Sequence, residues 1–277
     1  MNSQVYPWIV AVLAILIAIG AGFAALNQPA AAPASATEQD AAVLLMHLQS
    51  DITMALEAID GRLGHAAFGL GGTNLTDDAA RGILANLSAT DPSIIDSAVS
   101  NASTILAAEP ATYRGIEGKD IRDQDHVRHI LASKRPIMSE MITVAEGFPA
   151  AVIATPVFVG EKFSGFASVA FRPYDLIAGI AGPAANGTPY QVMVVQTDGR
   201  VLYDTDEAQI GRMTFEDPLY AENPGLQDAA RRVVAERYGT ATYEFAADGG
   251  EAVQKTITWT TTGLHGTEWR VAVIWEV

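Results

Sequence analysis

The feature that most constrains this chain is an uncharged, strongly apolar run over residues 8–26 (WIVAVLAILIAIGAGFAAL). A helix rises about 1.5 Å per residue, so a helix of this length nearly spans a hydrocarbon core about 30 Å thick. Tyr6 and Trp8 lie where aromatic side chains meet a membrane interface. A buried helix of a soluble domain rarely continues so far without a polar stripe. The run therefore predicts a transmembrane anchor or a signal segment over residues 1–28.

The sequence after this run favours export of the rest of the chain. Residues 29–37 (PAAAPASAT) form a spacer of small residues, and Ala34-Ser35-Ala36 within it resembles a signal-peptidase site. Four Asn-X-Ser/Thr sequons begin at Asn74, Asn86, Asn101 and Asn186. No basic residue precedes the run, which favours an anchor over a cleaved signal. We expect a single-pass protein of the cell membrane with an extracytoplasmic body, or a secreted body if the segment is cleaved.

Composition excludes several classes of function. The formal net charge of −15 argues against nucleic acid as a partner, because phosphate binding needs clustered Lys and Arg. The absence of cysteine excludes disulfides, thiolate catalysis and zinc-thiolate sites. Hydrophobic residues make up 49% of the chain, enough for a sizeable core.

A long amphipathic helix is predicted over residues 38–72. Its apolar positions recur at steps of three and four: Ala41, Leu45, Leu48, Ile52, Ala55, Ile59 and Leu63. This near-heptad seam could pair with a second copy to form a homodimer, or it could pack on the chain's own domains. Both alternatives remain open at this point.

A first α+β module is predicted over residues 73–182. Thr76-Asp77-Asp78 is a good N-terminal signal for a short helix, and Asp91-Pro92 predicts another helix through Val99. The remaining expected elements are strands at 103–108 and 112–116, a helix at 121–133, and strands at 137–144, 151–158 and 165–171.

The same order of elements recurs in a second module over residues 188–277, after a linker of small and turn-forming residues at 181–189. Asp198-Gly199 supplies the positive φ of a tight turn between two strands. The expected elements are strands at 190–196 and 200–203, a helix at 226–238, and strands at 241–245, 253–260 and 268–275. The repeated order predicts an α+β fold of two modules, each a mainly antiparallel sheet with helices on one face.

In this arrangement the chain resembles the double Cache family, the paired PAS-like sensor modules found outside the membrane in chemoreceptors and sensor kinases. Residues 194–212 (VVQTDGRVLYDTDEAQIGR) resemble the family's turn-and-strand opening. Residues 118–127 (GKDIRDQDHV), 154–158 (ATPVF) and 164–171 (SGFASVAF) resemble its helix entry and sheet hairpin. The resemblance covers residues 40–277. It implies that the first module is membrane-distal and the second membrane-proximal.

Two departures limit what the resemblance implies. Family members usually return to the membrane and continue into a cytoplasmic transmitter, whereas this sequence ends at Val277. The amino-acid-binding subset carries an aromatic/Arg/Asp signature that is incomplete here. We therefore expect a small-ligand-binding sensory module without its own transmitter, acting through a separate membrane signalling partner, with the class of ligand open.

The resemblance also implies where a small-molecule pocket would lie, between the sheet and the helix-side loops of the membrane-distal module. By position, the expected lining residues are Tyr113, Arg114, Arg135, Ser139, Glu146 and Phe148. Arg114 or Arg135 would clamp a carboxylate, and Tyr113 or Phe148 would form an apolar wall. The alternative is that both arginines are solvated or pair with neighbouring acidic residues.

Other polar clusters predict no metal or cofactor. The spacing of four aspartates does not fit a calcium loop, so turns and helix N-caps are their expected roles: Asp198, Asp204, Asp206 and Asp217. His126 and His129 are three residues apart but lack a third ligand, and we expect them on the surface. His265 is expected in a turn between strands.

No nucleophile elbow or phosphate-binding glycine loop occurs, so we do not expect an enzyme. The alternative function is a structural or adhesive cell-surface protein that uses the modules as spacers. That alternative predicts a distal module filled by side chains, without a cavity near Arg114 and Arg135.

Overall fold

The computed structural model describes residues 35–221, 223–246 and 252–277. The predicted anchor at 1–28 and most of the predicted spacer lie outside these residues. The chain divides into two compact units, Met1–Gln39 and Asp40–Val277, and the second unit holds both sheets.

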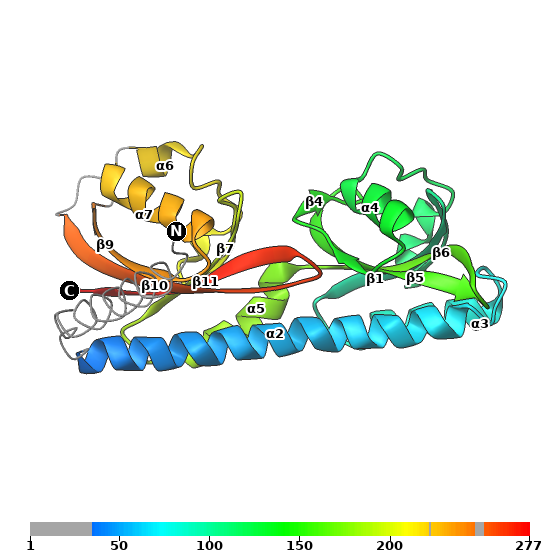
Figure 1. Ribbon diagram of the computed structural model, residues 1–277, viewed down its shortest axis with the longest axis horizontal. Helices are drawn as coiled ribbons and strands as arrows, with labels where there is room; N and C mark the ends of the chain where they lie inside the picture. The colour runs from blue at the N-terminus through cyan, green and yellow to red at the C-terminus, as the bar shows by residue number, and fades with distance from the viewer. Residues whose placement is uncertain (1–34, 222, 247–251) are drawn as a thin grey trace, which may run out of the picture. The chain divides into compact units, whose positions relative to one another are not determined.

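The predicted long helix is α2 (Ala36–Leu70), which passes beneath both sheets (Figure 1). Its predicted apolar stripe is buried, except that Leu56 takes the place expected for Ala55. Hydrogen bonds fix the helix to the last hairpin of the chain: Thr53 Oγ1 lies 2.9 Å from Thr262 Oγ1, and Asp60 Oδ1 lies 2.8 Å from His265 Nε2. Of the alternatives for this seam, packing on the chain's own modules is therefore the one the structure shows.

Among the described helices, α2 is also the one that is long and apolar enough to cross a membrane. Length and composition alone give this result. The buried stripe instead makes α2 the central helix of the second unit, because its leucines and isoleucines belong to the core cluster that both sheets share.

The N-terminal module (residues 78–171) is built around an antiparallel sheet in the order β2-β1-β6-β5-β3, with β4 paired to β5. Its elements are α3 (Asp78–Ser88), β1 (Ile94–Asn101), β2 (Thr104–Glu109), η1 (Ala111–Ile116), α4 (Asp125–Ser133), β3 (Ile137–Met138), β4 (Ile142–Thr143), β5 (Pro149–Val159) and β6 (Lys162–Phe171).

Two predictions for this module are wrong. The helix expected after Asp91-Pro92 is the strand β1, because Asp91 Oδ1 accepts hydrogen bonds from the amide and the hydroxyl of Ser93 and closes a turn instead of capping a helix. Both faces of β1 are covered, so its sequence is buried almost throughout and does not alternate cleanly. The strand expected at 112–116 is the 3₁₀-helix η1.

The C-terminal module (residues 191–276) repeats the same topology in the order β8-β7-β11-β10-β9. Its elements, with the helix that precedes them, are α5 (Pro173–Ala185), β7 (Gln191–Gln196), β8 (Val201–Asp204), η2 (Glu207–Gln209), α6 (Pro218–Ala221), α7 (Pro224–Ala235), β9 (Gly239–Phe245), β10 (Val253–Leu264) and β11 (Thr267–Glu276). The predicted α+β fold of two antiparallel modules is thus confirmed.

The linker predicted at 181–189 is only partly a linker, since its first residues complete α5. Small side chains in this segment serve packing as well as turns, because Ala181 and Ala185 are buried against the core. The predicted Asp-Gly turn is confirmed by Gly199, with φ of +93°, where a Cβ would meet the ring of Phe215 at 2.6 Å.

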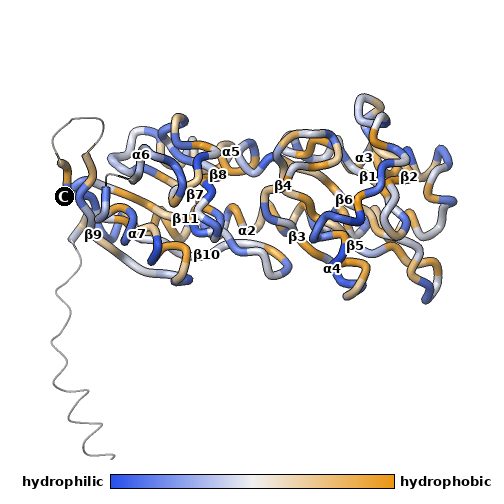
Figure 2. The backbone as a smooth tube through the Cα atoms, turned by 90° about the horizontal axis from the view of Figure 1, so that it is seen from above, coloured by the Kyte–Doolittle hydropathy of each residue, from blue (hydrophilic) through white to orange (hydrophobic). Residues whose placement is uncertain are grey.

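One hydrophobic cluster lies behind both sheets and includes α2, α5 and the inward faces of the strands. The rings of Phe171 in β6 and Trp269 in β11 lie 6.4 Å apart within it, linking the two modules. The opposite faces of the two sheets carry separate clusters beneath α4 and α7. In Figure 2, hydrophobic segments recur through the strands of both sheets.

Candidate functional site

Each sheet has a cavity on the face that is turned away from α2. The N-terminal cavity lies beneath α4 and has a volume of about 30 Å³. The C-terminal cavity lies beneath α7 and has a volume of about 120 Å³. The two cavities occupy corresponding places in modules of the same topology, but their linings differ in chemistry.

The strand β1, which lies between β2 and β6, brings polar side chains into the N-terminal cavity. Side chains alternate along a strand, so Asp96, Ala98 and Ser100 share the face that lines the cavity. Ser168 of β6 is paired with Ala98 in the register and adds a hydroxyl. The helix α4 contributes His126. These polar side chains lie among the apolar residues on the face of the N-terminal sheet that is covered by α4.

Three atoms around this cavity are buried without a hydrogen-bond partner among the described residues: Asp96 Oδ2, Ser100 Oγ and His126 Nδ1. Their residues are only 3%, 1% and 4% exposed. A buried polar atom without a partner destabilises a fold by about 1–3 kcal/mol, and such atoms are rare in native proteins. Three of them at one cavity indicate a site whose partners come from outside the chain.

Burial controls the protonation of this site. Desolvation, followed by the hydrogen bond and the charge of Glu146, raises the pKa of Asp96 to about 9. The carboxyl group of Asp96 therefore holds its proton at neutral pH. Desolvation lowers the pKa of His126 to about 4, so its imidazole is neutral there. The prediction that His126 lies on the surface is wrong, whereas His129 is exposed as expected.

Of the six residues predicted from position, Glu146 lines the N-terminal cavity. Tyr113 and Phe148 contact each other edge to face, with ring centroids 6.4 Å apart, in a small apolar cluster on the same module. The structure brings these two rings together as an apolar pair, but neither ring lines the N-terminal cavity.

The other three predicted residues have local roles. Arg114 forms an ion pair with Glu109, its Nε lying 3.0 Å from the carboxylate. Arg135 is exposed. Ser139 accepts a hydrogen bond from the amide of Val152 at 2.9 Å and donates to the carbonyl of Glu140 at 2.7 Å, which joins the start of the β3–β4 segment to β5.

Reasoning from sequence missed Asp96, Ser100 and His126. The signal for the first two was present: Asp96 and Ser100 stand four residues apart in the run IIDSAVSN, so both share one face of a strand. His126 stands beside Val127 and four residues before Ile130, the buried stripe of a short helix. Both signals depended on the correct assignment of the local element.

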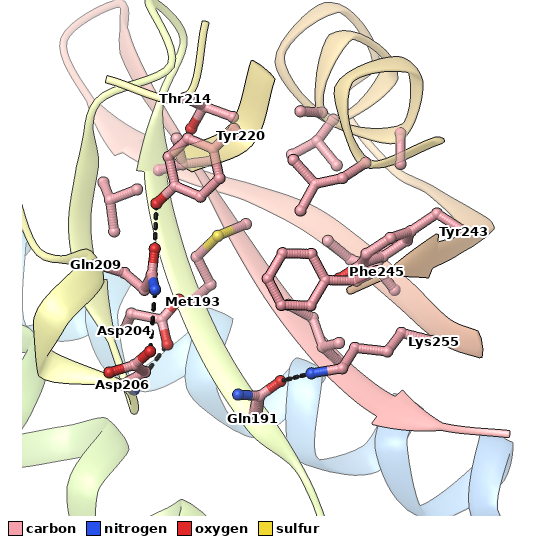
Figure 3. A pocket seen from close by; sticks show the side chains of 18 of the residues that line it. Gln191, Met193, Asp204, Asp206, Gln209, Thr214, Tyr220, Tyr243, Phe245 and Lys255 are labelled. Atoms are coloured by element: carbon pink, nitrogen blue, oxygen red, sulfur yellow. Dashed lines mark hydrogen bonds between the residues drawn. The ribbon is translucent and has the colours of Figure 1, made fainter. Parts of the chain in front are cut away.

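The C-terminal cavity lies between the sheet and α7, with a polar wall on one side (Figure 3). Tyr220 donates its hydroxyl proton to Gln209 Oε1, and Gln209 Nε2 donates to Asp206 Oδ2 at 2.9 Å. The amide of Asp206 donates to Asp204 Oδ1 at 2.8 Å. The polar wall is thus a connected chain of side chains from β8, η2 and α6.

The opposite side of the cavity is aromatic and aliphatic. Tyr243 and Phe245 of β9 stand across from the polar wall, and Met193 lies between the two sides (Figure 3). Lys255 Nζ donates to Gln191 Oε1 at 2.9 Å and lies 5.5 Å from the ring centroid of Phe245. The helix α7 closes the cavity with small and branched side chains.

Asp204 is the buried acid of this cavity, with 8% of its surface exposed. Desolvation raises its pKa to about 7, a shift that the hydrogen bond from the Asp206 amide partly offsets. Asp206 also caps η2 through the amide of Ala208, and Asp198 accepts from the amide of Arg200, which are the capping and turn roles predicted for these residues. Among the described residues, no three His, Cys, Asp or Glu side chains are grouped to hold a metal.

Residues 54–173 match a family model described as "HK/GC/Chemotaxis protein-like, sensor domain". This segment is similar to sensor domains of this class. Every residue of the N-terminal cavity lies inside the matched segment. The predicted resemblance to the sensor modules of chemoreceptors and sensor kinases is confirmed.

Solved structures extend this similarity over both modules. An extracellular ligand binding receptor from Desulfohalobium retbaense DSM5692 is 27% identical, with a TM-score of 0.72, over 85% of this chain. The match spans 40% of the length of that receptor. No curated protein matches the chain.

The ligand-binding domains of two chemoreceptors share the fold of this chain. The ligand-binding domain of PctB from Pseudomonas aeruginosa PAO1, in complex with L-Gln, is 14% identical over 85% of this chain and 89% of that chain, with a TM-score of 0.59. The ligand-binding domain of CtaA from Pseudomonas fluorescens, in complex with L-isoleucine, is 17% identical over 86% and 92%, with a TM-score of 0.59.

Proposed function

We propose that this protein is an extracytoplasmic small-molecule sensor whose ligand places a polar head group in the N-terminal cavity. The observation that carries the proposal is the set of three buried, unpartnered polar atoms on Asp96, Ser100 and His126. They face one cavity inside the segment that matches a sensor domain. A ligand that supplies their partners stabilises the module and thereby reports its own presence.

The size and charge of the cavity favour a hydrogen-bond-donating or cationic head group. A volume of about 30 Å³ accommodates a group about as large as one water molecule, such as a primary ammonium. The carboxyl groups of Asp96 and Glu146 and the hydroxyl of Ser100 can accept its hydrogen bonds. The chemoreceptors PctB and CtaA, in complexes with L-Gln and L-isoleucine, bind ligands that carry such a group.

The remainder of the ligand would extend beyond this cavity. Tyr113, Arg114, Arg135, Ser139 and Phe148 remain the predicted contacts for it. Arg114 would have to exchange its ion pair with Glu109 for a ligand carboxylate, whereas Arg135 is exposed and available.

We further propose that the protein is held in the membrane by residues 1–28 and acts through a separate signalling partner. A homodimer would use the exposed side of α2, because the predicted seam is already buried in the chain. That side carries exposed Val43, Met46, Met54 and Phe68. Phe68 is 88% exposed, and a second copy that covered it would remove apolar surface from water.

The alternative, a structural or adhesive spacer, is less well supported. A spacer requires only well-packed modules, and unpartnered buried polar atoms lower its stability without benefit. The chain instead concentrates three of them at one cavity.

Isothermal titration of the full chain in detergent with a panel of amino acids and primary amines tests the proposal. At least one compound should bind, and Asp96→Asn and Glu146→Gln should each weaken its binding about 10-fold or more, because each replaces a carboxyl group that can accept a hydrogen bond from the head group. Glu161→Gln, at the exposed β5–β6 turn, is the matched control and should bind like the original protein. Absence of binding across the panel, or unchanged affinity in Asp96→Asn, would contradict the proposal.

A further inference from the structure

The C-terminal cavity is far larger than the N-terminal one and is lined mainly by apolar side chains. We propose that it is a second, independent ligand site, which takes a small molecule with a six-membered ring or a compact aliphatic body and one terminal amine or hydroxyl that donates a hydrogen bond to Asp204.

The volume sets the size of the occupant. At about 120 Å³, the cavity is close to the roughly 150 Å³ of an engineered protein cavity that binds benzene. Protein interiors are close-packed, and few voids exceed the size of a water molecule. A cavity of this size beneath α7 therefore indicates space kept for an occupant.

The walls favour a ring or a branched chain. Tyr243 and Phe245 present aromatic surfaces from β9, and Met193 of β7 offers a polarisable side chain beside them (Figure 3). Aromatic and methionine side chains pack well against a flat apolar ring. On the helix side, Ala230 leaves room that a larger residue would fill.

The polar end selects a hydrogen-bond donor. Several other polar side chains of the cavity already bond to each other, as in the chain from Tyr220 through Gln209 to Asp206 and the pair of Lys255 with Gln191. Asp204 is buried, and its Oδ1 accepts a hydrogen bond from the Asp206 amide at 2.8 Å. A carboxyl group accepts several hydrogen bonds, so Asp204 retains acceptor capacity for a ligand amine or hydroxyl.

The two cavities share no lining residue, so the second site is distinct from the proposed head-group site. The N-terminal cavity draws on β1, β5, β6 and α4, and the C-terminal cavity on the strands β7 to β11 and on α7. Each can be altered without touching the other.

Titration of the full chain in detergent with benzylamine, benzyl alcohol, toluene and methylamine tests this proposal. Benzylamine and benzyl alcohol, which combine a ring with a donor, should bind more tightly than toluene, which lacks the donor, and than methylamine, which lacks the ring. Ala230→Leu fills the cavity and should weaken benzylamine binding about 10-fold or more. Ala235→Leu makes the same change on the exposed side of α7 and should leave binding unchanged.

Two further variants separate the parts of the proposal. Asp204→Asn should weaken benzylamine about 10-fold and leave toluene unaffected, because it removes the charged acceptor and keeps the shape. Asp96→Asn, in the other cavity, should leave toluene binding unchanged, because toluene has no polar head group for that cavity. The site is overturned if no ring compound binds, or if Ala230→Leu remains folded by circular dichroism and binds benzylamine as well as the original protein. The donor requirement is overturned if Asp204→Asn binds benzylamine unchanged.

Discussion

The two modules share one strand order and yet enclose different spaces. In the N-terminal module, isoleucine, valine and phenylalanine side chains fill most of the volume beneath α4 and leave a small polar cavity. In the C-terminal module, α7 turns Ala229 and Ala230 toward the sheet, and a larger apolar cavity remains. The comparison teaches that topology fixes where a cavity can form, while side-chain volume and polarity at the helix–sheet contact decide its size and its ligand.

The largest expected effect concerns α7, the helix that covers the C-terminal cavity, and the arginine that fixes its end to the sheet. The end of α7 is fixed by Arg270 of β11, which is 3% exposed; its Nε donates to the carbonyls of Val233 and Glu236, and its guanidinium pairs with Glu268. We expect Arg270→Met to lower the free energy of unfolding by about 3–5 kcal/mol, because it removes the hydrogen bonds and the ion pair of a buried guanidinium. Chemical denaturation measures this loss. A loss below about 1 kcal/mol would show that water replaces the guanidinium.

The next effect is a pH dependence that belongs to the N-terminal module. The pKa of Asp96 in the folded state, about 9, lies above its unfolded value near 3.9, so the folded state holds a proton that the unfolded state has released. The free energy of unfolding should therefore fall as pH rises, by about 1 kcal/mol per unit between pH 7 and 8.5. His126, with its lowered pKa, acts in the opposite direction and only below about pH 6.5.

Thermal or chemical denaturation at several pH values, with Asp96→Asn as the comparison, measures this slope. Asp96→Asn should lose most of this slope. Asp204→Asn should keep the slope, because the pKa of Asp204 is about 7 and this group contributes to the pH dependence of stability mainly at lower pH. An equal slope in the original protein and in Asp96→Asn would refute the raised pKa of Asp96.

A third expectation compares the two cavities directly by the same substitution. Ala98→Leu adds more atoms than the N-terminal cavity can hold and should destabilise the protein by about 1–3 kcal/mol. Ala230→Leu adds the same atoms where about 120 Å³ is free, and the free energy of unfolding should stay within about 0.5 kcal/mol or rise. Equal destabilisation by both would mean that the C-terminal cavity is not available for filling.

The smallest expected effect lies at the end of α4. Lys134 ends that helix in the left-handed conformation, with φ of +54°, and its ammonium lies 3.8 Å from the ring centroid of Phe163. Lys134→Gly removes the conformational strain, worth about 1 kcal/mol, and also the cation–π contact, worth about 0.5–1 kcal/mol. The two changes should nearly cancel in denaturation experiments. A loss above about 1 kcal/mol would show that the ammonium contact stabilises the protein by more than the left-handed backbone destabilises it.

Much of the fold could be predicted from sequence because its signals are local and periodic. The stripe of α2, the strands β5 to β7 and the Asp-Gly turn at Gly199 each depend on residues within one element. The strand β1 could not be assigned because Asp91-Pro92 gives the same local signal before a turn as before a helix.

The sites were harder to predict for a different physical reason. A void is the volume that distant side chains fail to fill, so the space between Met193 in β7 and Ala230 in α7 leaves no spacing signature. Arg114 and Ser139, which were predicted to line a pocket, instead form local interactions with Glu109 and with the amide of Val152. Burial of Asp96 became visible only once β1 was known to be covered on both faces.

The single cluster behind both sheets has a consequence for cooperativity. Since α2 and α5 belong to the same core as strands of both modules, neither module can lose its inner face without exposing part of the other's. Heating should therefore give one calorimetric transition, with equal calorimetric and van't Hoff enthalpies. A ligand in either cavity would then raise the melting temperature of the whole unit. Binding in one module would thereby stabilise the other module as well, without any change in its structure.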